Sequence, residues 1–212
     1  MQHRAVLFDM DGTLLDTLAD LRCGVNCILD RHGYPLRTTE EIRLFVGNGA
    51  RELIRLALPQ GTPEETMEAV LEEYRTWYRD NSCVKTAPYP GVPELLEQLR
   101  KAGVLMAVVS NKPHAVTVQL AQQFFPGLPA FGQRDGVPQK PAPDMVFHAM
   151  ETLGVRQQET VYVGDSEVDV ATARNAGLDL AAVSWGFRSR EVLTTAGAQH
   201  IADTPEQLLG LL

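Results

Sequence analysis

Strands and helices alternate along the C-terminal part of this chain, and this alternation strongly restricts the folds that it can adopt. Short apolar runs predict strands at residues 104–109, 160–163 and 180–183, with a short final strand at 200–201. Helical patterns lie around and between them, at residues 92–103, 143–153 and 167–176, after Pro113 and from Thr204 onward. Because parallel strands need a crossover, usually a helix, the alternation predicts a parallel sheet with helices on both faces. The apolar run at residues 4–8 predicts one more buried strand, ending at Asp9.

Residues 16–81 differ from the rest because they contain helical patterns only. Leu18, Leu21 and Val25 recur on one helix face, and Thr38 begins a second helix with the spacing of a capping box. Four helices between one strand and the next are too many for a simple crossover. We therefore predict an α/β core formed by residues 1–15 and 82–212, with residues 16–81 inserted as a small all-helical cap domain.

The charge balance narrows the possible partners. The formal net charge is −8, and such a surface repels nucleic-acid backbones and anionic membranes. No apolar run is long enough to cross a bilayer, and no secretory signal pattern is present. The three cysteines follow no metal-binding spacing. We predict a cytoplasmic monomer or homodimer with reduced thiols that binds neither nucleic acid nor membrane.

Polar residues gather where the predicted strands end. The clusters at strand ends are Asp9-Met10-Asp11-Gly12-Thr13, Ser110-Asn111-Lys112 and Gly164-Asp165-Ser166, and a fourth, Gln139-Lys140-Pro141, lies in a loop that precedes a helix. The carboxyl ends of parallel strands meet at one edge of a sheet, which is where ligands of such sheets bind. The pattern therefore predicts one site built from two or more carboxylates, a hydroxyl group and a lysine.

Asp9 and Asp11 are two residues apart, so on an extended backbone their side chains project to the same side. Two neighbouring carboxylates repel each other unless a cation neutralises them. Asp165, at another strand end, is placed to complete a set of oxygen ligands, and such a set suits Mg²⁺. The sequence thus predicts a magnesium site with Asp9 and Asp165 among its ligands.

This arrangement predicts chemistry on a phosphate ester. Asp9 is the candidate nucleophile on phosphorus, and Asp11 the candidate general acid and then general base. Ser110 and Lys140 are predicted to bind the phosphate oxygens, where charge spreads in the transition state. Asp169 lies one helical turn after Asp165 and is predicted to hold metal-bound water.

Each motif also has a purely structural explanation. Asp-x-Asp-Gly is common in turns, and Ser110 after a strand is a typical helix N-cap. Lys140 alone is an ordinary solvated lysine, and Asp165 and Asp169 suit the start of a helix. The functional interpretation depends on all of them occurring in this order at strand ends.

Four segments together resemble the motifs of the haloacid dehalogenase superfamily. They are Phe8-Asp9-Met10-Asp11-Gly12-Thr13-Leu14-Leu15-Asp16-Thr17, Val109-Ser110-Asn111-Lys112, Lys140-Pro141-Ala142-Pro143-Asp144, and Gly164-Asp165-Ser166 with Asp169. The resemblance implies a Rossmann-like, three-layer core with a helical cap inserted after the first motif. It also implies metal ligation by Asp9, the backbone carbonyl of Asp11 and Asp165, with Gly12, Thr13, Ser110 and Asn111 around the bound phosphate.

Within the superfamily, the chain is most similar to phosphoglycolate phosphatases. The dehalogenase branch lacks the second aspartate, which is Asp11 here. The phosphonate-cleaving branch needs a lysine in the cap, and residues 16–81 contain none. A phosphohexomutase, a pyrophosphatase or nucleotidase, and a catalytically inactive binding module remain alternatives.

We therefore expect a magnesium-dependent hydrolase of small phosphorylated metabolites, with 2-phosphoglycolate as the first substrate to test. Specificity is expected to lie in the cap segment Gly47-Asn48-Gly49, which offers backbone amides. Arg51, which follows it, is a candidate to bind a substrate carboxylate. The alternative is that the glycines separate two helices and that Arg51 is solvated.

Overall fold

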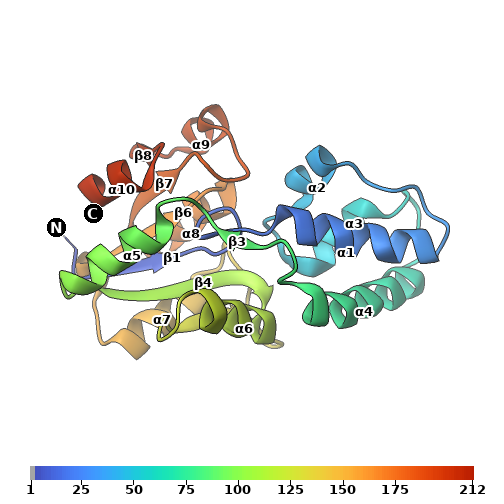
Figure 1. Ribbon diagram of the computed structural model, residues 1–212, viewed down its shortest axis with the longest axis horizontal. Coiled ribbons are helices and arrows are strands. Elements are labelled where there is room, and N and C mark those ends of the chain that lie inside the picture. The colour runs from blue at the N-terminus through green and yellow to red at the C-terminus, as the bar shows by residue number, and fades with distance from the viewer. Residues whose placement is uncertain (1–2) are drawn as a thin grey trace.

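The computed structural model describes residues 3–212 and shows a helix-covered sheet with a group of four helices beside it (Figure 1). The strands are β1 (Ala5–Phe8), β2 (Leu15–Asp16), β3 (Ala87–Pro88), β4 (Leu105–Pro113), β5 (Ala130–Gln133), β6 (Thr160–Gly164), β7 (Asp179–Val183) and β8 (Ile201–Ala202). The helices are α1 (Leu18–Arg31), α2 (Thr39–Phe45), α3 (Gly49–Ala57), α4 (Glu64–Asn81), α5 (Val92–Lys101), α6 (His114–Phe124), α7 (Asp144–Leu153), α8 (Glu167–Ala176), α9 (Arg190–Ala196) and α10 (Pro205–Leu211).

The main sheet has the strand order β5-β4-β1-β6-β7-β8, and every neighbouring pair is parallel. β1 lies inside the sheet and is apolar throughout, as expected for a strand covered on both faces. Val6 and Phe8 pack in the cluster that includes α5, α6 and α10, whereas Ala5 and Leu7 pack with α7 and α8. This alternation produces three layers, so the predicted α/β fold class is confirmed.

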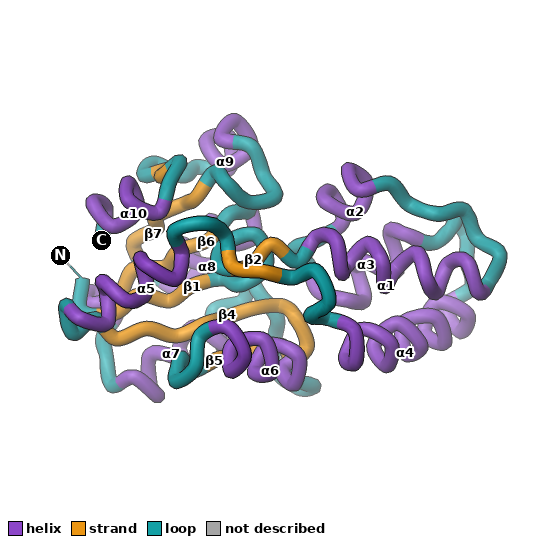
Figure 2. Tube along the Cα trace, viewed as in Figure 1, coloured by secondary structure: helices purple, strands orange, loops and turns teal. Residues whose placement is uncertain are grey.

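The sequence patterns did not predict two features of the strands. β5 was not predicted, because its four residues are too few to show a periodicity. β2 and β3 form a separate antiparallel pair, joining Leu15 to Pro88 and Asp16 to Ala87. They are the two segments by which the chain passes between the core and the helical group (Figure 2). A two-residue strand carries no sequence signal of its own.

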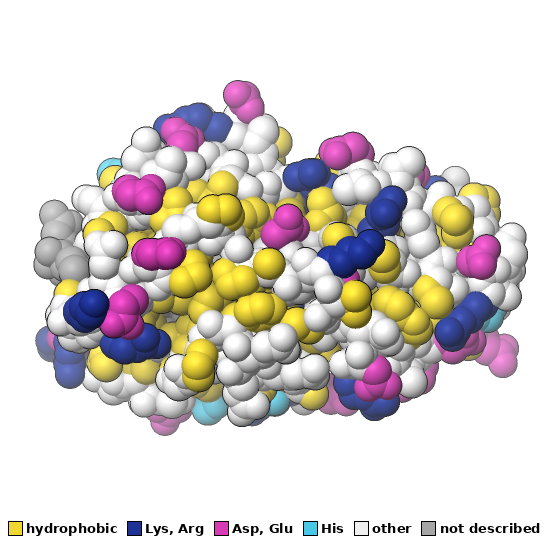
Figure 3. All heavy atoms as spheres, viewed as in Figure 1, with side chains coloured by type: hydrophobic (Ala, Val, Ile, Leu, Met, Phe, Trp, Pro, Cys, Tyr) yellow, Lys and Arg dark blue, Asp and Glu magenta, His cyan; other side chains and the backbone are white. Residues whose placement is uncertain are grey.

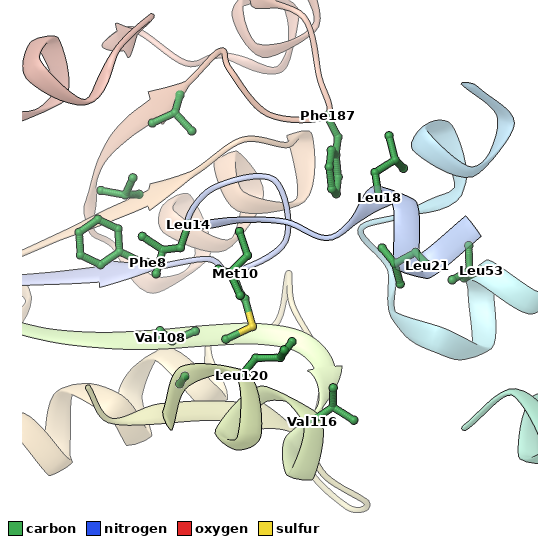
Figure 4. Close-up of a cluster of buried hydrophobic side chains, with 14 of the residues drawn as sticks. Phe8, Met10, Leu14, Leu18, Leu21, Leu53, Val108, Val116, Leu120 and Phe187 are labelled. Atoms are coloured by element: carbon green, nitrogen blue, oxygen red, sulfur yellow. The ribbon is translucent and has the colours of Figure 1, made fainter. Parts of the chain in front are cut away.

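The helical group, which we call the cap, consists of α1 to α4 and packs around its own apolar faces. α1 buries Leu21, Val25 and Ile28, and α4 buries Val70 and Leu71. The apolar interior is continuous with that of the core. Figure 4 shows the side chains that link the two parts, running from Phe8 and Val108 through Met10 and Leu14 to Leu18, Leu21 and Leu53.

Asp20 of α1 fastens the segment that leads back to the core. Its buried carboxylate accepts hydrogen bonds from the backbone N–H groups of Val84, Lys85 and Thr86 at 2.8–2.9 Å, and from the Thr86 hydroxyl at 2.9 Å. Residues 82–86 are therefore attached to the cap, whereas Asp16 already belongs to β2. We propose residues 17–86 as the cap, a shift from the predicted range of 16–81.

Replacing Asp20 with alanine is expected to destabilise the fold by about 3 kcal/mol. The substitution leaves several backbone N–H groups without an acceptor, and each buried unsatisfied group costs about 1–3 kcal/mol. Urea unfolding of D20A and of the exposed control D80A measures the difference; the control should stay within about 0.5 kcal/mol of the wild type. Equal stability of D20A and D80A would refute this role of Asp20.

Charged side chains of both signs are interspersed on the molecular face shown in Figure 3. Within residues 3–212, none of the helices combines the length and the hydrophobicity that a membrane crossing requires.

Candidate active site

The carboxyl ends of three central strands bring the predicted site residues together. Phe8 of β1 is in register with Val108 of β4 and Val163 of β6. Asp9, the next residue, is anchored by its N–H group, which donates to the Val163 carbonyl at 2.8 Å. Asp165 directly follows β6. The parallel register therefore places both carboxylates at one edge of the sheet.

Lys140 lies at the centre of a buried polar network. Its Nζ donates to Oδ1 of Asp9 at 2.7 Å, to Oδ1 of Asp169 at 2.8 Å and to the hydroxyl of Tyr162 at 3.0 Å. The three donors of the ammonium group thus have three partners. The other oxygen of Asp169 accepts from the N–H and hydroxyl groups of Ser166, closing a capping box at the start of α8. Both oxygens of Asp169 therefore help to hold Lys140 in place.

Asp165 is packed tightly against glycine backbone. The hydroxyl of Thr13 donates to its Oδ1 at 3.1 Å, and the N–H group of Phe187 donates to its Oδ2 at 2.7 Å. A Cβ atom at Gly12 would lie 2.2 Å from this carboxylate, and one at Gly186 would lie 2.4 Å from it. Gly12 also has a φ of 90°, which side-chain-bearing residues rarely adopt. These positions need glycine to leave room for Asp165.

The carboxylates of this cluster are held in a strongly unfavourable environment. Burial raises the pKa of Asp9 to about 7, although the Lys140 ammonium opposes this shift. Burial also raises the pKa of Asp165 well above its ordinary value, and the neighbouring Asp169 and Asp9 add to the effect. Burial alone lowers the pKa of Lys140, but Asp169 and Asp9 outweigh it and raise that pKa. Lys140 is therefore charged, but its single positive charge is not enough to neutralise the buried carboxylates around it.

The donor set fits a hard divalent cation. Asp9, Asp165 and Asp169 each offer a carboxylate oxygen, and these atoms lie within 4.8 Å of one another. The three carboxylates and the single ammonium group of Lys140 leave two negative charges when all are ionised. A divalent ion with a preference for oxygen ligands, such as Mg²⁺, balances that charge. The residues present therefore fit the predicted magnesium ion.

Asp11 lies beside this cluster and contacts the cap as well as the core. Its Oδ1 accepts a hydrogen bond from the Thr17 hydroxyl at 2.6 Å and lies 3.0 Å from Nζ of Lys112. Nζ of Lys112 also lies 2.9 Å from the hydroxyl of Tyr78 in α4 and 4.7 Å from the centroid of its ring. Asp11 is thus connected through Lys112 to the cap.

A pocket opens between the cap and the ends of the strands, and its cavity is about 50 Å³. Asp9, Asp11, Ser110 and Lys140 all line it, as the sequence predicted. On the cap side the wall is mostly apolar and aromatic, formed by Leu21, Val46, Ala50, Leu53, Tyr74 and Tyr78. Nucleophilic, acidic and cationic groups therefore face one small, partly apolar space.

Side chains of the core hold the cap over this pocket through its backbone. Nη1 of Arg188 donates to the carbonyl of Arg43 at 2.6 Å, and Nη2 donates to that of Val46 at 2.8 Å. The amide of Asn111 donates to the Gly47 carbonyl at 3.0 Å. The same amide brackets the backbone of Lys140, with contacts of 2.9 and 2.8 Å. The side chain of Asn111, predicted to bind phosphate, is therefore engaged in positioning both the lysine and the cap.

Arg51, Gly12 and Thr13, which were predicted to contact substrate or phosphate, do not line the cavity. Arg51 pairs with Glu64 and Glu68 of α4, and its side chain is half exposed. The preceding residue, Ala50, lines the pocket, and consecutive residues of a helix point about 100° apart, so Arg51 faces away. Gly12 and Thr13 lie against Asp165 instead of lining the pocket. Their contribution is to place that carboxylate.

Other residues of the site were not assigned a role from the sequence. Tyr162 supports Lys140, and the only signal was a tyrosine inside an otherwise apolar strand, where its hydroxyl needs a partner. Lys112 and Arg188 also line the pocket. Their roles depend on contacts with Asp11, Tyr78 and the end of α2, which no local pattern reveals.

Comparison with known proteins supports a single family. Residues 6–183 match the sequence profile of the haloacid dehalogenase-like hydrolases. Phosphoglycolate phosphatase 1 of Pseudomonas aeruginosa is 34% identical over 214 residues, which cover 97% of this chain and 78% of that protein. The N-acetylmuramic acid 6-phosphate phosphatase of the same organism is 33% identical, over all of this chain and 96% of that protein.

The fold has close counterparts among solved structures. A proposed phosphoglycolate phosphatase from Lactobacillus delbrueckii subsp. bulgaricus superimposes with a TM-score of 0.94 and 38% sequence identity. The match covers 100% of this chain and 98% of that one. The resemblance drawn from the four sequence motifs is therefore confirmed.

Proposed function

This chain belongs to the haloacid dehalogenase-like hydrolases, and from that membership and the geometry of its pocket we propose that it is a magnesium-dependent phosphatase of small phosphate monoesters. The observation that supports this proposal most strongly is the pairing of Asp9 with Lys140 at 2.7 Å, in a pocket that Asp11 and Asp165 also line. A nucleophile, a cation for phosphoryl oxygens and a candidate proton donor thus surround one cavity.

The reaction follows from these positions. A carboxylate oxygen of Asp9 attacks phosphorus, the bond to the ester oxygen breaks, and Asp11 gives a proton to the departing oxygen. An acyl phosphate on Asp9 results. Asp11, now ionised, takes a proton from a water molecule that attacks the same phosphorus, which releases phosphate and restores Asp9. Ser110 and Lys140 bind the phosphoryl oxygens on which negative charge spreads.

Magnesium supplies charge neutralisation of the phosphoryl group and the carboxylates when it is bound. We assign its protein ligands to Asp9, Asp165 and the backbone carbonyl of Asp11. Asp169 belongs to the same acidic cluster, but both of its oxygens have protein partners. We assign it to the orientation of Lys140, and to a bound water of the metal as its secondary contact.

We propose 2-phosphoglycolate as a better substrate than a phosphorylated amino sugar, because several of the similar relatives are named phosphoglycolate phosphatases. The test is phosphate release from 2-phosphoglycolate, N-acetylmuramic acid 6-phosphate and β-glucose 1-phosphate, with and without magnesium. We expect magnesium-dependent release that is fastest with 2-phosphoglycolate. Absence of release from all three, or isomerisation of the hexose phosphate, would contradict the proposal.

Magnesium-free protein is expected to lose stability as the pH rises from about 4 to about 7. The pKa of Asp9 is raised from 3.8 to about 7, so in this range the folded state binds more protons than the unfolded state. Stability therefore falls as these protons leave. Magnesium binds the ionised carboxylates of the folded state. The increase in melting temperature that magnesium causes should therefore become larger as the pH rises.

Thermal unfolding between pH 4.5 and about 8, in EDTA and in excess magnesium, measures this difference. D165N serves as the control, because it removes one proposed ligand and should abolish most of the magnesium effect. A magnesium-induced shift that is the same at every pH would argue against the buried carboxylates as its origin.

A further inference from the structure

Three cations line the pocket among the described residues, and two of them are already engaged. Lys140 has three partners at the nucleophile. Arg188 is divided between Glu167 and the carbonyl groups at the end of α2. Lys112 has two polar partners, Asp11 and Tyr78. Because an ammonium group has three donors, Lys112 retains one for a ligand.

Lys112 is also the cation on the leaving-group side of the pocket. Its Nζ lies 3.0 Å from Oδ1 of Asp11, the carboxylate assigned to protonate the departing ester oxygen. An atom bonded close to that oxygen therefore comes near Lys112. The cap-side wall here is apolar and aromatic, with Leu53, Tyr74 and Tyr78, and the Lys112 side chain is only 2% exposed. A charge in such surroundings interacts more strongly with an opposite charge than it does in water.

From this geometry we propose that Lys112 binds an anionic group on the leaving group of the substrate, one or two carbons from the ester oxygen. The substrate class is a small phosphate monoester with an adjacent carboxylate. This inference rests on the proposed function and identifies Lys112 as the residue that recognises the anionic group of the substrate. Tyr78 of α4 orients the ammonium group from the cap, so the specificity contact is complete only when the cap lies over the pocket.

This assignment differs from the one that the sequence suggested. Arg51 was the candidate for a substrate carboxylate, but it faces Glu64 and Glu68 outside the pocket. Arg51 and Lys112 therefore form a matched pair of cations for a test. One is buried beside Asp11, and the other lies on the surface of the cap.

The experiment compares kcat/KM for 2-phosphoglycolate with that for 2-hydroxyethyl phosphate, whose leaving group has a neutral hydroxyl in place of the carboxylate. The wild type is expected to prefer 2-phosphoglycolate by about 10- to 100-fold, the effect of one charge-assisted hydrogen bond. K112M should lose most of this preference, whereas R51M should keep it. The ratio of the two substrates is the readout, because Lys112 also contacts Asp11 and its loss lowers turnover of both.

Each outcome decides the matter. Equal kcat/KM values for the two substrates in the wild type would overturn the role of Lys112 but leave the phosphatase intact, even if K112M did not fold. A preference that survives in K112M, or one that disappears in R51M, would also overturn it. Release of phosphate from neither substrate by the wild type would overturn the proposed function together with this inference.

Discussion

D9N is expected to lose phosphatase activity by at least about 10⁴-fold while keeping its fold. Asparagine has nearly the same shape as aspartate but cannot form the acyl phosphate, so the reaction loses its nucleophile. Lys140 donates to the Asp9 carboxylate at 2.7 Å, and the Asp9 N–H group donates to the Val163 carbonyl at 2.8 Å. An asparagine at this position can keep both contacts. The measurement is magnesium-dependent phosphate release by D9N and the wild type.

The matched control is D179N, which changes an exposed aspartate far from the pocket. It should retain the activity of the wild type, and both variants should have unchanged circular dichroism spectra. Substantial turnover by folded D9N would mean that another group attacks phosphorus.

K140M is expected to combine a loss of activity of about 10²- to 10³-fold with a loss of stability. Lys140 is the only basic partner of Asp9 and Asp169 among the described residues. Without it, these buried carboxylates are uncompensated, and removing one partner of a buried ion pair costs about 3–5 kcal/mol. Activity falls because the ammonium group no longer keeps Asp9 ionised or binds the phosphoryl oxygens.

The loss of stability should depend on pH. It should be largest at neutral pH and above in the absence of magnesium, and smaller at acidic pH, where Asp9 becomes protonated. K101M, which changes an exposed lysine paired only with Glu97, is the control and should remain within about 0.5 kcal/mol of the wild type. A K140M enzyme with wild-type kcat and stability would refute the central position of this lysine.

The sequence predicted the layers of the fold because its buried strands are long enough to show a pattern. β1, β4 and β6 appear in the sequence as apolar runs followed by polar residues. Their parallel arrangement follows from the helices between them. β5 and the β2–β3 pair could not be predicted, because two to four residues show no period. The end of the cap near residue 86 depends on Asp20 accepting hydrogen bonds from a segment more than 60 residues away.

For the site, the sequence predicted the residues that end strands, because topology alone brings them together. Asp9 and Asp165, which directly follow β1 and β6, are of this kind. It could not predict Lys112 as the partner of Asp11, because that pairing depends on where Tyr78 of the cap lies. Arg51 was misplaced for the same reason: which face of α3 meets the pocket is decided by packing against α4 and not by nearness in sequence to Gly49.

During turnover a phosphoryl group is expected to become covalently attached to Asp9. The most direct measurement uses D11N with p-nitrophenyl phosphate, whose leaving group needs no proton, so that attachment proceeds while hydrolysis is slowed. After acid quenching, mass spectrometry should find one phosphoryl group on the peptide that contains Asp9, and hydroxylamine should remove it. Phosphoryl on another residue, or turnover with none bound to the protein, would contradict the account.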